Sequence, residues 1–398
     1  MNVIEVKNLS KIFGKNPNQA LKLLDEGYSK DEILEKTGNT VGVNRASFEV
    51  KAGEIFVIMG LSGSGKSTLV RLINRLIEPT EGTIMIGDQD LSKADKKTLR
   101  DIRRKKLGMV FQNFALFPHR TILENAEFGL EIQGESKESR SKKAKEALEM
   151  VGLGGYFDQY PNQLSGGMQQ RVGLARALAN DPDVLLMDEA FSALDPLIRK
   201  DMQDELIELQ STMRRTILFI THDLNEALRL GDRIALMRDG EIVQIGSPED
   251  ILVNPANDYV EKFVEDVDRS KVLTAQHIMQ RPETVNIENH GPRVALEAMR
   301  KEGISGVYDV DSNRQLKGYV HANDASASAK KDIRKLDDIL KTNVPTVEKD
   351  TPMSEIFNII HDAPIPVAVV ENGRLLGIIV RGSVIAALSE DGEVNINE

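Results

Sequence analysis

A glycine-rich loop that starts at Gly60 constrains the fold of this chain more than any other feature of the sequence. The loop matches the pattern G-x-x-x-x-G-K-[ST], which requires a strand before it and a helix after it. An apolar run from Ile55 to Met59 precedes the loop, and apolar residues at helical spacing follow it from Leu69 to Leu76. In such a loop, backbone N–H groups close around phosphate oxygens, and the positive end of the helix dipole faces the same charge. The sequence therefore predicts an α/β fold that binds a nucleotide.

The residues that would hold the phosphates are those of the loop, namely Gly60, Ser62, Gly63, Ser64, Gly65, Lys66, Ser67 and Thr68. Lys66 would reach the β- and γ-phosphates, and the Ser67 hydroxyl would bind Mg²⁺. The alternative is a glycine-rich turn with a chance lysine, which the flanking strand and helix patterns disfavour. The motif by itself leaves many families of nucleotide hydrolases open.

Polar residues with the chemistry of hydrolysis follow two other apolar strands. The run from Val184 to Met187 ends in Asp188 and Glu189, which point in alternate directions. Asp188 would bind Mg²⁺, and Glu189 would polarise the water that attacks the γ-phosphate. His222 follows the strand from Thr216 to Ile220, so it would meet these carboxylates and the loop at one sheet edge. The alternatives are a solvated pair of acids and a structural histidine.

The composition favours an intracellular chain of several domains. Its 398 residues exceed one ordinary core and fit two or three domains. The sequence lacks cysteine and tryptophan and shows no charged and apolar leader at its start, which favours the cytoplasm and a protein without disulfides.

Charge and hydropathy narrow the partners. No window approaches the ~20 consecutive apolar residues that cross a bilayer, so a membrane role would need a partner that spans it. The net charge of -11 and the pI near 5.3 disfavour nucleic acid, which needs a basic face.

The first domain is predicted to span residues 1–267, with two helical additions to its strands. Residues 16–39 interrupt the β-rich start with two short helices, the second opened by Ser29 and Glu32 at capping-box spacing. A helical subdomain is expected over about 113–180.

A weak internal repeat follows the first domain and indicates duplicated modules. The order β-α-β-β-α occurs twice, about sixty residues apart. The two repeats are predicted over 272–330 and 336–392, and an acidic tail covers 393–398.

A second glycine-rich element, Leu164-Ser165-Gly166-Gly167-Met168, stands about a hundred residues after the first. With it, residues 1 to about 250 resemble the ATP-binding cassette (ABC) proteins, with every family motif in order. The resemblance implies a P-loop NTPase cassette, a mixed sheet core with a helical subdomain, which hydrolyses ATP with Mg²⁺. It also implies a head-to-tail dimer, because Leu164–Met168 is the signature motif that contacts the ATP of a second copy.

The same resemblance assigns roles to further residues. Phe13 matches the aromatic that stacks on adenine, and Gln112 matches the glutamine that senses Mg²⁺ and the attacking water. His222 matches the switch histidine, and Asp195 the aspartate that crosses the dimer interface. Their ordinary alternatives are a core aromatic, a strand-end polar residue, a buried histidine and a helix cap. The implied catalytic residues are Glu189, His222, Lys66 and Gln112, the implied Mg²⁺ ligands are Ser67, Gln112 and Asp188, and the residues toward the second ATP are Ser165, Gly166, Gly167 and Asp195.

Nearly the whole chain resembles ATPase subunits of importers for glycine betaine, proline betaine and related quaternary amines. This resemblance rests on four features: the insert at 16–39, the segment from Ile55 to Ser62, Met168 and Ala190. It implies osmoprotectant uptake with a transmembrane permease, alone or fused to a substrate-binding domain, at the cytoplasmic face of the membrane. The alternatives are an importer of another amino acid or amine, and a soluble cassette ATPase outside transport.

The C-terminal repeats are similar to a tandem pair of CBS domains, α+β modules that often bind adenosine-containing ligands. Of the family's ribose contacts only Asp324 is retained, which disfavours plain ATP or AMP. A cyclic adenine dinucleotide is the expected ligand, and a pair that only dimerises and braces the ATPases is the alternative.

Lys330, Lys331, Arg334 and Lys335 form a basic run between the repeats. A solvated helix is the default interpretation. The hypothesis beside it is an anionic membrane as partner, released when salt shortens the Debye length from ~10 Å at 0.1 M to ~3 Å at 1 M. The acidic tail competes for the same charges.

Overall fold

The computed structural model describes residues 2–265, 267, 270, 272–286, 290–331, 333 and 339–388. The chain divides into two compact units, Met1–Val264 and Glu265–Glu398. Each unit has hydrophobic clusters of its own. The predicted regulatory residues Arg334 and Lys335 and the acidic tail 393–398 lie outside the described residues.

A six-stranded mixed sheet forms the centre of the first unit. Its strands, in order across the sheet, are β10 (Glu241–Gly246), β9 (Arg233–Arg238), β3 (Ile55–Met59), β8 (Thr216–Thr221), β7 (Val184–Asp188) and β6 (Leu107–Phe111). Only the β9–β10 pairing is antiparallel, and the other neighbours run parallel. Every residue of β3 and β8 is buried. Such continuous apolar strands are typical of a parallel sheet that is covered on both faces.

A four-stranded antiparallel sheet packs beside the central one. Its order is β2 (Thr40–Lys51), β1 (Asn2–Phe13), β4 (Glu81–Ile86) and β5 (Gln89–Asp90). One core cluster joins both sheets and helix α3 (Lys66–Ile73), and it includes Phe48 of β2 stacked at 5.2 Å on Phe56 of β3. This shared core holds β1 and β2 against the central sheet.

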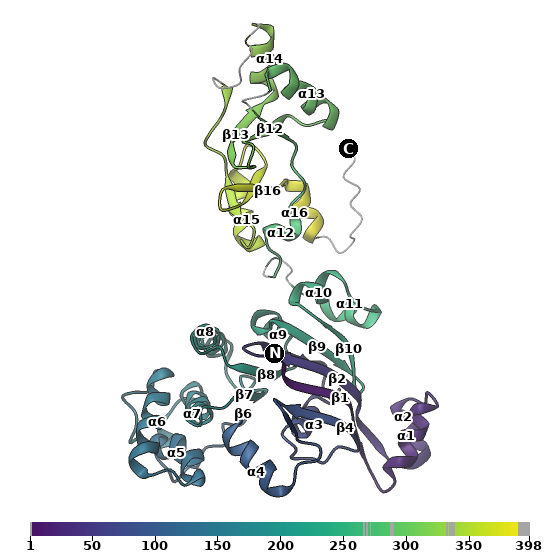
Figure 1. Cartoon of the computed structure of the whole chain (residues 1–398), viewed down its shortest axis with the longest axis vertical. Coiled ribbons are helices and arrows are strands. Elements are labelled where there is room, and N and C mark those ends of the chain that lie inside the picture. Colours follow the sequence, from purple (N-terminus) through teal and green to yellow (C-terminus); the bar gives the residue numbers. More distant parts are fainter. Residues whose placement is uncertain are drawn as a thin grey trace. The chain divides into compact units, whose positions relative to one another are not determined.

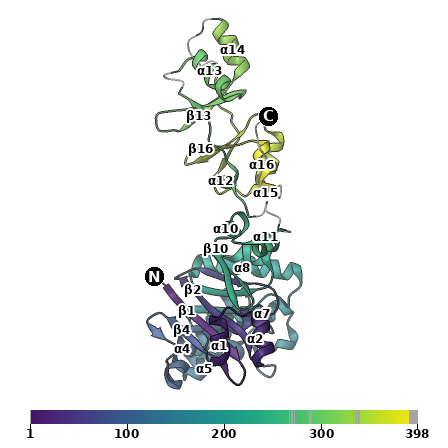
Figure 2. The same cartoon turned by 90° about the vertical axis from the view of Figure 1, so that its right-hand side faces the viewer.

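Two short helices occupy the insert between β1 and β2, α1 (Pro17–Asp25) and α2 (Lys30–Thr37). Ser29 and Glu32 form the predicted capping box at the start of α2. A small cluster of Ile12, Ala20, Ile33 and Val41 holds the insert on the two strands. The helices lie side by side in both cartoon views (Figures 1 and 2).

Helices α5, α6 and α7 gather at the side of the first unit opposite to α1 and α2 (Figure 1). The remaining helices of the unit follow the chain as α4 (Lys96–Lys105), α5 (Ile122–Gln133), α6 (Lys137–Met150), a 3₁₀ turn η1 (Pro161–Gln163), α7 (Gly166–Leu178), α8 (Pro196–Met213), α9 (Leu224–Leu230), α10 (Pro248–Val253) and α11 (Asp258–Val264).

The second unit holds two three-stranded sheets with the same strand order. Helix α12 (Ala275–Ile278) comes first along the chain and packs in the hydrophobic cluster of the second half. The first half comprises β11 (Thr284–Val285), α13 (Pro292–Glu302), β12 (Gly306–Val310), β13 (Leu316–His321) and α14 (Ala322–Lys330). The second half comprises β14 (Thr346–Glu348), α15 (Met353–Asp362), β15 (Val367–Glu371), β16 (Arg374–Ile379) and α16 (Arg381–Leu388). The predicted order β-α-β-β-α thus occurs twice.

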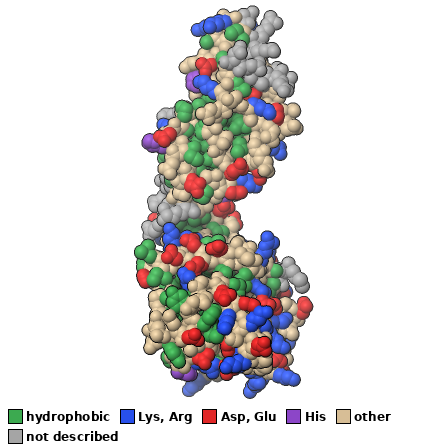
Figure 3. Space-filling model, turned by 90° about the vertical axis from the view of Figure 1, so that its left-hand side faces the viewer, with side chains coloured by type: hydrophobic (Ala, Val, Ile, Leu, Met, Phe, Trp, Pro, Cys, Tyr) green, Lys and Arg blue, Asp and Glu red, His purple; other side chains and the backbone are tan. Residues whose placement is uncertain are grey.

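Positive and negative side chains are interspersed over the face of the first unit that Figure 3 presents. On that face, therefore, charges of one sign do not form a single large patch.

Across the described parts of the chain, no helix combines the length and the apolar character needed to cross a membrane.

Candidate nucleotide-binding site

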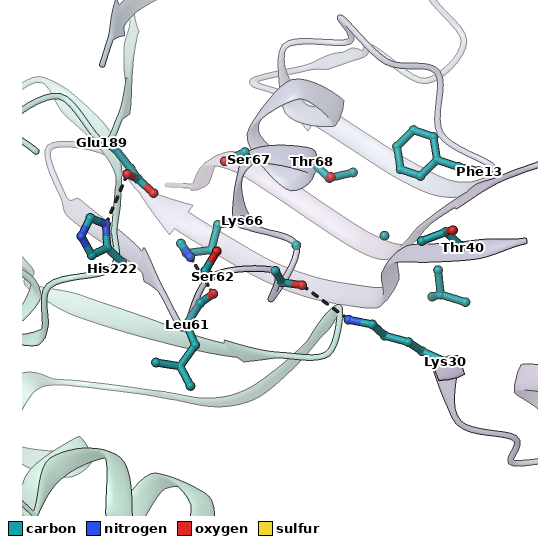
Figure 4. Close-up of a pocket in the computed structure, with 14 residues that line it drawn as sticks. Phe13, Lys30, Thr40, Leu61, Ser62, Lys66, Ser67, Thr68, Glu189 and His222 are labelled. Carbon is teal, nitrogen blue, oxygen red and sulfur yellow. Dashed lines mark hydrogen bonds and ion pairs between the residues drawn. The ribbon is translucent and has the colours of Figure 1, made fainter. Parts of the chain in front are cut away.

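The carboxyl ends of four parallel strands deliver the predicted catalytic residues to one edge of the central sheet. The phosphate loop follows β3, Gln112 follows β6, Glu189 follows β7 and His222 follows β8. A cavity of about 650 Å³ opens there (Figure 4). Its size lies within the range of small-molecule sites, and this edge is where open α/β sheets bind ligands.

The backbone of the phosphate loop requires glycine at two positions. Gly60 has φ +152°, and a Cβ there would lie 2.2 Å from the carbonyl oxygen of Met237. Gly65 has φ +104°, and a Cβ there would lie 2.4 Å from the carbonyl oxygen of Gly42. The loop therefore wraps tightly between its neighbours and leaves its N–H groups at the start of α3 free to face an anion.

Lys66 is buried beside this loop and donates to the carbonyl oxygens of Gly60 at 2.7 Å and Leu61 at 3.0 Å. Burial lowers the pKa of the Lys66 ammonium, and the charges of Glu189 and Asp188 oppose that shift. A phosphate would offer this desolvated cation stronger, charge-assisted partners than the two carbonyls.

Glu189 lies between two side chains from neighbouring strands. Its Oε2 is 3.2 Å from Nδ1 of His222 and 3.4 Å from Nε2 of Gln112. Gln112 also donates to the hydroxyl of Ser192 at 3.0 Å. Glu189 itself has φ +46°, an unusual conformation for a residue other than glycine. Glu189 and His222 line the cavity, so a water between the carboxylate and a bound phosphate would meet a proton acceptor.

Asp188, Ser67 and Gln112 offer oxygen atoms, which are the ligands that Mg²⁺ prefers. Burial raises the pKa of the Asp188 carboxyl, with the charge of Glu189 adding to the effect. A divalent cation would relieve this unfavourable burial, so the donor set fits the metal. Ser67 lines the cavity, and Asp188 and Gln112 lie outside its lining.

Phe13 stands at the mouth of the cavity, at the end of β1, and its side chain is 40% exposed. The ring rests on Gly42, where a Cβ would lie only 2.8 Å from the Phe13 Cε2. Thr40 and Val41 at the start of β2 line the same end of the cavity. The Lys11 ammonium lies 5.2 Å from the centroid of this ring. An exposed ring in this position offers a nucleotide base a surface for stacking, beside or in place of that lysine.

Comparisons with known proteins agree with this site. The family model described as "ABC transporter" matches residues 43–192, and the model described as "CBS domain" matches 336–390. The chain is 63% identical to the glycine betaine/carnitine transport ATP-binding protein GbuA of Listeria monocytogenes, with all of both chains covered. The chain belongs to the ABC transporter ATP-binding proteins. The predicted family and its P-loop NTPase cassette are confirmed.

Two more relatives cover almost the whole chain. The glycine betaine transport ATP-binding protein OpuAA of Bacillus subtilis is 63% identical over 98% of this chain and 93% of its own. The glycine betaine/proline betaine transport system ATP-binding protein ProV of Escherichia coli is 51% identical over 98% of this chain and 99% of its own. Among solved structures, the dimeric ATP-binding cassette MJ0796 in a post-hydrolysis state bound to ADP and Pi is 35% identical, with a TM-score of 0.52. That match covers 62% of this chain and 98% of the MJ0796 chain.

The ABC signature lies away from the cavity of its own chain. The described residues that line the cavity do not include Ser165, Gly166, Gly167 or Asp195. Ser165 caps α7, since its hydroxyl accepts from the N–H of Met168 at 3.3 Å. Asp195 is exposed at the N-cap of α8. Their contact with a nucleotide stays a prediction that requires a second copy.

The cavity also contains residues that the sequence analysis missed. Lys30, Thr40, Val41, Gly42 and Leu61 all line it. Thr40 pairs with Phe13 in the β1–β2 ladder, so the register across the insert brings the start of β2 to the base-binding end. No motif marks Lys30, whose place depends on how the insert folds back.

The second unit has a separate cavity of about 480 Å³ between its two halves, with Tyr308, Tyr319 and Pro366 in its lining. The Tyr308 hydroxyl donates to the carbonyl oxygen of Pro366. The predicted Asp324 is not among the described residues of that lining and instead pairs with Lys341 at 3.1 Å. Lys330 and Lys331 are exposed at the end of α14.

Proposed function

We propose that this chain is the ATP-hydrolysing subunit that powers an importer of glycine betaine or a closely related compatible solute. The observation that carries the proposal is identity of 63% along the entire length of a glycine betaine/carnitine transport ATP-binding protein, both units included. The cavity at the sheet edge supports it, because this cavity combines a phosphate loop, a carboxylate and an exposed aromatic ring.

Each residue of the site has a separate role in hydrolysis, which its position determines. Phe13 stacks on adenine, and the loop from Gly60 to Thr68 holds the phosphates. Glu189 accepts the proton of the attacking water, while Lys66 and His222 stabilise charge on the transferred phosphoryl group. Mg²⁺ held by Ser67, Asp188 and Gln112 would neutralise phosphate charge.

The functional form is a head-to-tail dimer of two copies with two ATP molecules between them. Ser165 and Gly167 of each copy donate to the ATP of the other, and Gly166 and Asp195 lie beside them. Two observations support this arrangement: these residues do not line their own cavity, and MJ0796 is a dimeric cassette. Hydrolysis removes the shared contact, so ATP favours the closed dimer and ADP the open one.

The importer also needs a transmembrane permease, and the cassette docks on it peripherally at the cytoplasmic face of the membrane. The segment around Gln112 suits this contact. Phe111, directly before Gln112, is exposed, and Phe117 anchors the segment by packing on Phe128 with ring centroids 4.5 Å apart. Solute selection lies in a substrate-binding domain, fused to the permease or separate from it.

The second unit regulates transport through its paired CBS domains. The matching strand order of its two halves supports a tandem pair, although the family model matches the second half alone. A cyclic adenine dinucleotide is the proposed ligand. The basic run that begins with Lys330 and Lys331 is proposed to bind anionic lipid at low salt and to release it as ionic strength rises.

The test is uptake by the chain and its permease partner, reconstituted in anionic vesicles with internal ATP. Glycine betaine uptake that rises with internal salt and is absent in Glu189→Gln supports an osmoregulated importer. ATP hydrolysis without glycine betaine uptake would contradict the proposed substrate. Neutralising the four residues of the basic run should abolish the salt dependence, because uptake at low salt should rise toward the level that the wild type reaches at high salt. Retained salt dependence would contradict the membrane contact.

A further inference from the structure

We propose that Lys30, at the start of helix α2 in the insert, is a nucleotide-binding residue that contacts the α- and β-phosphates of ATP. The proposal rests on the ATP site described above and adds to it a second cation from outside the phosphate loop. In Figure 4 the Lys30 side chain approaches the loop from the side of Phe13 and Thr40. Lys66 lies toward Glu189 and His222 in the same view.

The backbone of Lys30 is held firmly beside the cavity. Lys30 is the first residue of α2 and lies inside the capping box, directly after its N-cap Ser29 and two residues before Glu32. Ile33, one turn further on, is fully buried in the cluster that anchors the insert. The position of the Lys30 Cα is therefore set by packing, while its four-carbon side chain remains free to reorient.

The contacts that Lys30 makes without a nucleotide are weak. Its Nζ is 3.5 Å from the carbonyl oxygen of Gly63 and 3.4 Å from Oδ1 of Asp239. Bonds from an ammonium to a charged acceptor are normally about 2.7–2.9 Å long. The Asp239 side chain is 64% exposed, and such a solvated ion pair adds little stability. Lys30 can therefore exchange these partners for phosphate oxygens at small cost.

The location of Lys30 favours contact with the α- and β-phosphates, which ATP and ADP share. The Gly63 carbonyl belongs to the phosphate loop itself, and Gly240, next to Asp239, donates to the Ser64 carbonyl at 2.9 Å. Lys30 thus sits over the rim of the loop, between the base-binding end and the catalytic end of the cavity. One buried lysine and Mg²⁺ leave part of the triphosphate charge unneutralised, and Lys30 supplies a further positive charge there.

The experiment measures dissociation constants of the full-length chain for ATP, ADP and adenosine with Mg²⁺ present. Lys30→Ala should weaken ATP and ADP binding equally, by about three- to tenfold, and should leave adenosine binding unchanged. The loss should shrink at high salt, because the contact is electrostatic. Lys30→Arg should restore affinity to within about twofold of the wild type, since it keeps the charge.

Two matched variants separate nucleotide binding from a structural role. Lys22→Ala removes an exposed lysine of α1, the other insert helix, and should leave affinity unchanged. Asp239→Asn removes the ion pair of Lys30 while the cation stays, and it should not weaken ATP binding. The proposal is overturned if Lys30→Ala matches Lys22→Ala, or if Asp239→Asn loses as much affinity as Lys30→Ala. A wild-type chain that binds no ATP would overturn the proposed function and this proposal with it.

Discussion

Nδ1 of His222 lies 3.2 Å from Oε2 of Glu189, at the ends of two neighbouring parallel strands. The Glu189 N–H also donates to the Ile220 carbonyl at 3.0 Å, which ties the carboxylate's backbone to the strand that carries the histidine. The two side chains therefore face the phosphate end of the cavity together.

Glu189→Gln should lower steady-state ATP hydrolysis by about 10²–10⁴-fold, because an amide cannot accept the proton of the attacking water. ATP affinity should remain close to that of the wild type, since Glu189 is not a ligand of the phosphates. A phosphate-release assay checks the hydrolysis rate, and an equilibrium binding assay checks the affinity for ATP. A variant that keeps a tenth or more of the wild-type rate would assign the base to another residue.

Phe13→Ala should weaken ATP binding by about 1–3 kcal/mol, the usual contribution of stacking a base on an aromatic ring. This corresponds to roughly 5- to 150-fold in Kd. Phe13→Tyr keeps the ring over Gly42 and serves as the control. An affinity of Phe13→Ala equal to that of the control would mean that the ring covers the sheet edge and does not contact the base.

Arg176→Ala should uncouple ATP hydrolysis from transport. Arg176 of helix α7 donates to the carbonyl oxygens of Ala115 at 2.6 Å and Phe114 at 3.0 Å, and both of these loop residues have positive φ. Without these charge-assisted bonds, each worth about 1.5–3 kcal/mol, the proposed permease-docking loop loses its conformation. Solute imported per ATP hydrolysed should fall about tenfold or more, while the ATPase of the isolated chain changes little.

Arg171→Ala is the matched control for that measurement, because Arg171 lies on the same helix but pairs with Glu205 instead of the loop. If the two variants import the same amount of solute per ATP hydrolysed, Arg176 contributes only to the stability of α7.

Glu226→Gln should stabilise the first unit at neutral pH. Glu226 is 5% exposed, and burial raises the pKa of its carboxyl above the ordinary 4.5, while hydrogen bonds from Thr221 and Gln203 oppose the shift. A raised pKa in the folded state contributes stability that is present below the unfolded pKa and is lost as pH rises through the folded value. A neutral glutamine avoids this loss, so Tm at neutral pH should rise by about 2–4 °C.

The same reasoning predicts that the difference in Tm narrows as pH falls and Glu226 becomes protonated in the folded state. Thermal unfolding at several pH values checks this. Glu208→Gln, at an exposed position of the neighbouring helix α8, should change Tm little at any pH. A constant difference between Glu226→Gln and the wild type across pH would contradict the assignment to this carboxyl.

The sequence predicted the catalytic end of the site because each residue there follows a strand directly. The phosphate loop, Glu189 and His222 stand immediately after β3, β7 and β8, and parallel strands end at a common edge. The base-binding end was predicted only at Phe13. Its other wall, Thr40 to Gly42, is reached through the register of β1 against β2 across the insert, which no local pattern encodes.

The amino-acid sequence by itself determined the family, the cassette fold, the repeated C-terminal order and the chemical groups available for hydrolysis, because motifs and periodicity are local properties of the chain. The tertiary structure alone decided that Lys30 reaches the rim of the phosphate loop and that Arg176 holds the segment after Gln112. These relationships depend on how separate elements pack, and packing is set by burial of apolar side chains such as Ile33 that carry no mark of function.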